Sequence, residues 1–85
     1  MKVREIVKNR LHEYFLSQFH LDIDMDTEED TPFLYYFDSL DLVEIDMDMS
    51  KHFNIDLEDV SEMWYFGTIK DIVDSIVTKL KEEGL

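Results

Sequence analysis

Cysteine is absent from this 85-residue chain, and glycine and proline are scarce, with two residues and one. Without cysteine the polypeptide can form no disulfide and offers no thiolate for catalysis or metal binding. No apolar run approaches the length that crosses a bilayer, and charged residues interrupt the N-terminal stretch where a signal peptide needs an apolar core. We therefore expect a cytoplasmic protein, in which any reactive thiol comes from an attached group.

Basic side chains are also few, since eight Lys and Arg stand against 21 Asp and Glu, a formal net charge of −13. Residues 21–62 hold fifteen of the acidic residues and one basic residue. Such charge repels nucleic acid and anionic membranes and attracts proteins with basic patches, mainly by raising association rates. With 45% hydrophobic residues, we expect residues 1–85 to fold as one monomeric domain whose partners are proteins.

Apolar residues recur at helical spacing in three stretches, which predicts three longer helices. The first covers residues 2 to about 18. The second opens at Asp38 and runs to Phe53, and the third follows the capping box Thr68-x-x-Asp71 and ends near Gly84. Alternating apolar and acidic residues in part of the second stretch would also fit a strand, but its cap signal and its Leu, Met and Glu content favour a helix.

The segments between these helices complete the expected fold. Residues 20–37 lose the helical period and collect six acidic side chains, so we expect a long loop there. Asp56 and Asp59 can cap a short helix through about Met63, followed by an aromatic turn at residues 64–67. The predicted fold is all-α: a small four-helix bundle of three longer helices and one short helix, with the long loop between the first and second.

The start of the second helix carries the strongest functional signal, Asp38-Ser39-Leu40-Asp41. Asp38 can accept a hydrogen bond from the free N–H groups that open a helix, and Asp41 lies in the first turn, where the helix dipole favours negative charge. Ser39 is thereby placed at a helix N-terminus, which tolerates a phosphate group. An ordinary helix-start serine is the simpler alternative, because serine is common at this position.

Projection of the second helix separates two apolar faces. Leu42, Ile45, Met49 and Phe53 share one face. A bundle helix needs only one buried face, so the other face is predicted to be a docking surface. It consists of Leu40, Val43 and Met47, rimmed by Asp41, Glu44 and Asp48.

The run Asp38-Ser39-Leu40-Asp41, followed by Val43-Glu44-Ile45, Met49 and Phe53, resembles the acyl carrier proteins and their relatives, the peptidyl and D-alanyl carriers. The resemblance extends through residues 53–57 and 68–73. It departs at residues 35–37, Tyr-Tyr-Phe, where the family usually has Leu-Gly, and at residues 50 and 51, where the family often has acidic residues.

This resemblance implies a fold of acyl-carrier type and a carrier function without catalysis by the chain itself. A phosphopantetheinyl transferase (holo-acyl-carrier-protein synthase) would attach 4′-phosphopantetheine to Ser39, beside its helix cap Asp38. The arm would carry acyl groups as thioesters to acyl-transferring and condensing enzymes with basic docking patches, in fatty acid, lipid or polyketide synthesis. A peptidyl or D-alanyl carrier with the same fold, or an unmodified acidic interaction module, remains the alternative.

Residues 33–37 form the densest apolar cluster of the chain. Either alternate members of this cluster pack on the core, or some of them rim the entrance for an acyl chain or contact a partner. The sequence leaves both possibilities open.

Neither a catalytic residue nor a metal site is expected. His12 and His20 belong to the first helix and its exit, and His52 lies more than three turns from Ser39 on the same helix. An EF-hand loop starting at residue 22 would need glycine at its sixth position and glutamate at its twelfth, where this chain has Thr27 and Phe33.

Overall fold

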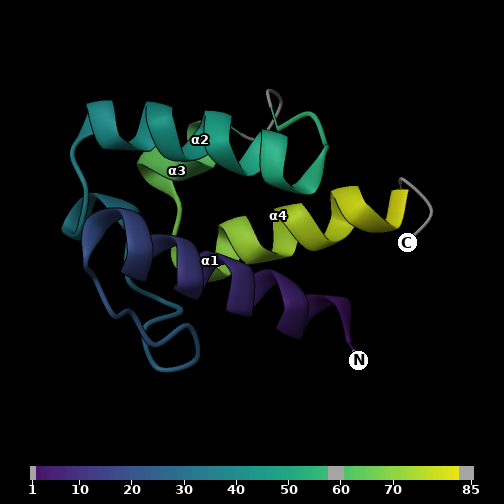
Figure 1. The fold of residues 1–85 in the computed structure, drawn as a ribbon, viewed down its shortest axis with the longest axis horizontal. Coiled ribbons are helices and arrows are strands. Elements are labelled where there is room, and N and C mark those ends of the chain that lie inside the picture. Colours follow the sequence, from purple (N-terminus) through teal and green to yellow (C-terminus); the bar gives the residue numbers. More distant parts are fainter. Residues whose placement is uncertain (1, 58–60, 83–85) are drawn as a thin grey trace.

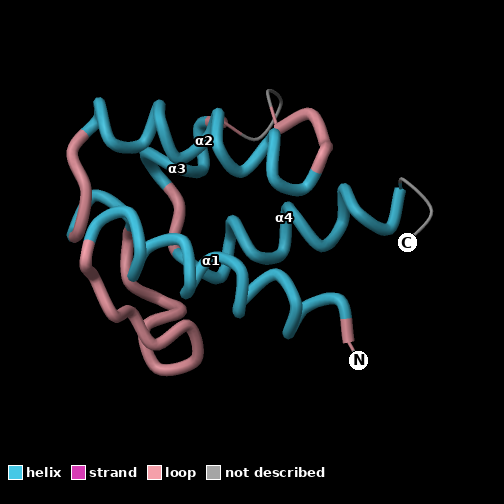
Figure 2. The backbone as a smooth tube through the Cα atoms, in the orientation of Figure 1, coloured by secondary structure: helices cyan, strands magenta, loops and turns pink. Residues whose placement is uncertain are grey.

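Four α-helices and one short 3-10 helix make up the regular structure of residues 2–57 and 61–82, which the computed structural model describes (Figure 1). This described part of the chain contains no strand, and its helices are joined by irregular loops (Figure 2). The expected all-α fold, a small bundle of three longer helices and one short helix, is confirmed. In chain order the elements are α1 (Val3–Phe19), η1 (Phe33–Tyr35, the 3-10 helix), α2 (Ser39–Phe53), α3 (Glu62–Phe66) and α4 (Ile69–Glu82).

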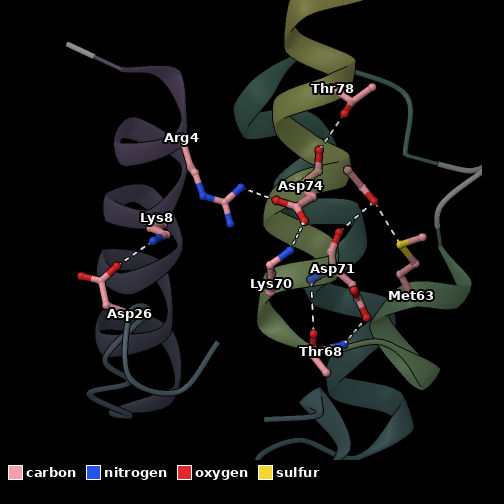
Figure 3. A network of polar contacts seen from close by, with 10 residues as sticks. Arg4, Lys8, Asp26, Met63, Thr68, Lys70, Asp71, Asp74 and Thr78 are labelled. Atoms are coloured by element: carbon pink, nitrogen blue, oxygen red, sulfur yellow. Dashed lines mark hydrogen bonds and ion pairs between the residues drawn. The ribbon is translucent and has the colours of Figure 1, made fainter. Parts of the chain in front are cut away.

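Helices α1 and α4 lie side by side, and α3 contacts η1, α2 and α4 (Figure 1). The buried residues of α1 recur every four positions, and those of α4 form the stripe expected from the sequence. Arg4 of α1 forms an ion pair with Asp74 of α4, whose other carboxylate oxygen accepts a hydrogen bond from Lys70 Nζ at 3.0 Å (Figure 3). The two helices are thus joined by apolar packing and, at the surface, by a shared carboxylate.

The ends of the longer helices are closed by local hydrogen bonds. Thr68 and Asp71 form the predicted capping box at the start of α4, with distances of 3.0 Å and 3.3 Å (Figure 3). Helices α1 and α2 are followed by His20 and Asn54, which both adopt left-handed backbone conformations, with φ of 58° and 55°. The expected end of the last helix near Gly84 lies outside the described residues.

The long loop between α1 and α2 is held by the chain that starts α4. Ile69 N donates to Thr31 O at 3.2 Å, and Lys70 N donates to Glu29 O at 2.8 Å. Ile23 and Met25 are buried in the core, although the loop around them is acidic. The loop was predicted, but these contacts across the molecule were not.

The short helix α3 differs from the prediction. It spans Glu62–Phe66 instead of ending near Met63, so the expected aromatic turn at residues 64–66 is helical. Its first turn has no side-chain cap, and the proposed cap Asp59 lies outside the described residues. Winding these residues into a helix buries Trp64 completely against Phe33, with ring centroids 5.1 Å apart, so tertiary packing overrides the local turn signal.

The aromatic cluster before α2 also follows helical spacing. Phe33 and Phe37 are buried, and Phe37 packs on Phe15 of α1 at 5.0 Å between ring centroids. The prediction that alternate members of the cluster pack on the core is wrong for Tyr35, which is 77% exposed. The cause is the helical turn at the start of the cluster, in which Phe37 N donates to Phe33 O at 3.0 Å and the first and last residues come to the same side.

Candidate modification site at the start of helix α2

Ser39 is the first residue of α2, and a reciprocal capping box fixes its position. Asp41 N donates to Asp38 Oδ1 at 2.9 Å, and Asp38 N donates to Asp41 Oδ2 at 3.3 Å. Leu42 N bonds to the carbonyl oxygen of Asp38 at 3.1 Å. The predicted cap is confirmed, and it holds the backbone on both sides of Ser39.

The Ser39 side chain is exposed, and its hydroxyl makes no hydrogen bond to any residue that the structure describes. The N–H groups of Ser39 and Leu40 have no intrahelical acceptor because they belong to the first turn. A phosphate ester on this oxygen would lie beside unpaired donors and the positive end of the helix dipole. The residues present therefore fit an attached phosphodiester.

No glycine is needed to present this serine. Among the described residues other than glycine, only His20 and Asn54 have positive φ values, and neither lies in the turn before α2. Tyr36 has φ of −104° and ψ of −31°, an ordinary right-handed conformation. The Tyr-Tyr-Phe sequence at residues 35–37 is thus compatible with the backbone that leads to Ser39.

The two faces of α2 lie as the projection predicted. Leu42, Ile45 and Met49 are buried in the core, and Phe53 packs partly against it. The opposite face exposes 79% of Leu40, 47% of Val43 and 56% of Met47. Ser39 therefore stands at one end of an apolar strip that no described part of the chain covers.

The acidic residues around this strip differ in their surroundings. Glu44 is exposed and forms no hydrogen bond or ion pair with a described residue. Asp41 is engaged in the capping box, and Asp48 is half-buried, where it accepts a hydrogen bond from the Tyr14 hydroxyl at 2.6 Å. Of the three predicted rim residues, Glu44 is the one whose carboxylate is fully available for a partner.

Two aromatic residues that the sequence reasoning missed hold α2 in place. Tyr14 of α1 binds Asp48, and Trp64 of α3 donates its indole N–H to Asp46 Oδ1 at 3.2 Å. The available signal was the chemistry of these side chains, since a buried phenol or indole needs a polar partner. The sequence did not indicate which acidic residue that partner would be.

Burial and these contacts shift the pKa values of Tyr14 and Asp46. Burial is the main reason that the pKa of Tyr14 lies well above its ordinary value, and the hydrogen bond to Asp48 adds to it. Burial likewise raises the pKa of Asp46, although the bond from Trp64 acts in the opposite direction. The helix that presents Ser39 is therefore held by one neutral phenol and one partly desolvated carboxylate.

Other polar clusters are placed away from Ser39. His52 lies at the opposite end of α2, about 20 Å along the helix axis. In the acidic loop, Asp22 pairs with His12 and Asp26 with Lys8, so these carboxylates point to different partners. Within residues 2–57 and 61–82, no group of three or more His, Cys, Asp or Glu residues could hold a metal ion.

None of the helices in the described residues combines the length and apolarity needed to cross a membrane. Comparison with known proteins gave no relative: no family model matches the chain, and neither a curated protein nor a solved structure is significantly similar to it.

Proposed function

We propose that this chain is a phosphopantetheine-dependent acyl carrier with Ser39 as its attachment site. The observation that carries the proposal is the Ser39 hydroxyl, which is exposed, makes no hydrogen bond to a described residue and sits on a backbone fixed by the capping box. The proposal also uses the resemblance of residues 38–53 to the carrier family. The strip of Leu40, Val43 and Met47 beside Ser39 supports a role in brief docking.

The attachment step is a phosphoryl transfer to the Ser39 oxygen, carried out by a separate transferase. A bond forms between Ser39 Oγ and the phosphorus of the pantetheine phosphate of coenzyme A. The bond from that phosphorus to the departing oxygen of adenosine 3′,5′-bisphosphate breaks, and a base of the transferase takes the serine proton. The attached arm supplies the thiol that the chain lacks, and an acyl group is carried on it as a thioester.

The acidic side chains around Ser39 attract partners with basic docking patches. Glu44 steers them, and Leu40, Val43 and Met47 give the apolar contact. Small interfaces of this kind dissociate quickly, which a carrier that visits several enzymes requires. The partners proposed are the transferase and the acyl-transferring and condensing enzymes of fatty acid, lipid or polyketide synthesis.

The test is mass spectrometry after incubation with coenzyme A and a phosphopantetheinyl transferase. The unchanged chain is expected to gain one phosphopantetheine group, and Ser39→Ala is expected to fold normally and gain none. Ser17→Ala is the matched control, because Ser17 is also an exposed helical serine, and it is expected to be modified.

Failure of the unchanged chain to be modified, both in this assay and in protein isolated from its host, would overturn the proposal. The result would favour an unmodified acidic interaction module that uses the same face of α2. If the arm is attached, the cargo found on it separates an acyl carrier from a peptidyl or D-alanyl carrier.

A further inference from the structure

A second apolar surface lies at the C-terminal end of α2, about 20 Å along the helix axis from Ser39. It is a groove of about 320 Å³ between the N-terminal half of α1 and the last turns of α2 and α4. These three helix segments lie at the same end of the molecule in Figure 1. The groove is lined by Val3, Ile6, Arg10, His52, Phe53 and Leu80.

Four of the six residues that line the groove are apolar. Ile6 is 37% exposed, Phe53 is half-buried, and Leu80 forms part of the core edge. Val3, Ile6 and Arg10 follow each other at spacings of three and four on one side of α1. The polar side chains of the lining are Arg10 and His52, so the groove combines apolar walls with the side-chain nitrogens of these two residues.

The charge of this groove is opposite to that of the rest of the protein. Residues 2–57 and 61–82 include 18 acidic residues, and none of these lines the groove. Arg10 makes no hydrogen bond or ion pair with any residue that the structure describes. One acidic residue, Glu5, adjoins a lining residue in sequence. Six of the eight basic residues either line the groove or adjoin a lining residue: Lys2, Arg4, Arg10, Lys51, Lys79 and Lys81.

These features select one kind of occupant. An anion fits Arg10, whose planar guanidinium can bind a carboxylate through two parallel hydrogen bonds. An extended peptide segment would leave backbone N–H and C=O groups unpaired against the apolar walls, whereas an unbranched alkyl chain has no such groups.

We propose that this groove binds a free alkyl carboxylate, with its chain against Ile6 and Phe53 and its carboxylate on Arg10. The volume suits a medium-length chain, near the lower end of the range for small-molecule sites. The binding is non-covalent and does not involve Ser39, so it is independent of the proposed carrier function.

The experiment is a titration of the full chain with decanoate below its critical micelle concentration. Binding is monitored by calorimetry and by the chemical shifts of the backbone amides. We expect saturable binding of one ligand, with the largest shifts at the groove. Hexanoate is expected to bind at least about tenfold more weakly than decanoate, because each buried methylene group adds affinity. The variant Ser39→Ala binds decanoate as the unchanged chain does.

Two variants separate the head group from the chain. Arg10→Gln lowers the affinity for decanoate about tenfold and leaves that for decanol unchanged, since only the charged contact is lost. Ile6→Ser, at a partly exposed position, lowers both affinities. Lys51→Gln is the control, because Lys51 is an exposed cation beside the groove that does not line it. The affinity of this variant for decanoate stays within about twofold of that of the unchanged chain.

Several results would overturn the proposal. They are the absence of saturation, equal affinity for decanoate and a decyl ammonium ion, no effect of Arg10→Gln, and shifts centred on Leu40, Val43 and Met47. A dimer in sedimentation experiments that Ile6→Ser dissociates would assign the groove to a second copy of the chain instead. Each of these outcomes is distinguishable from a failure of Ser39 modification.

Discussion

The orientation of α2 can be tested with two leucines on the same helix. Leu42 is fully buried, and Leu40 is 79% exposed, two positions away. Leu42→Ala removes roughly three buried methyl or methylene groups, which costs about 2.4 kcal/mol in transfer free energy. The cavity that remains adds to this loss, so we expect the free energy of unfolding to fall by about 3 kcal/mol.

Leu40→Ala is the matched control, because it makes the same chemical change on the opposite face. We expect its free energy of unfolding to stay within about 0.5 kcal/mol of the unchanged chain. For a domain of this size, the melting temperature should fall by roughly 15 °C in Leu42→Ala and by no more than about 4 °C in Leu40→Ala.

Urea denaturation followed by far-ultraviolet circular dichroism measures both free energies, provided that the denaturant slopes of the variants agree. Equal losses in the two variants, or a larger loss in Leu40→Ala, would refute the assignment of the faces. Helix α2 would then be rotated about its axis, and the strip beside Ser39 would not be available for docking.

Three further predictions concern other contacts of the fold. Gly67→Ala should lower the free energy of unfolding by about 1–3 kcal/mol, because a Cβ there would lie 2.7 Å from the backbone oxygen of Met63; a melting temperature equal to that of the unchanged chain would contradict this close approach. Tyr14→Phe should cost about 1 kcal/mol at neutral pH through loss of the bond to Asp48. Because the pKa of Tyr14 is raised in the folded state, the contribution of its hydroxyl to stability is present below about pH 10 and is lost as the pH rises toward the folded-state pKa. The difference in free energy of unfolding between Tyr14→Phe and the unchanged chain should therefore narrow in alkaline urea titrations. A difference that stays constant with pH would argue against this role of the hydroxyl. Glu44→Lys should slow association with a basic partner at low salt, and the effect should shrink at high salt; stopped-flow rates that do not change at low salt would count against steering by this face.

Much of the fold follows from short-range information in the sequence. The apolar period of α1, α2 and α4 predicted which residues face the core, because a helix repeats its environment every three to four residues. The capping boxes at Asp38 and Thr68 were also predictable, since each closes hydrogen bonds between residues three positions apart. The exposed position of Ser39 at the start of α2 follows from the same local rules.

Other features depend on residues that are far apart in the chain. Tyr14 and Asp48 are separated by 34 positions, and nothing near either residue indicates their pairing. Helix α3 extends to Phe66, beyond its predicted end near Met63, because Trp64 packs against Phe33. The residues next to Trp64 in the sequence do not encode this contact. The apolar groove arises only where the ends of three helices meet. The sequence thus determined the helices and their faces through local periodicity and capping, whereas the tertiary structure decided which faces meet, since that depends on packing between distant segments.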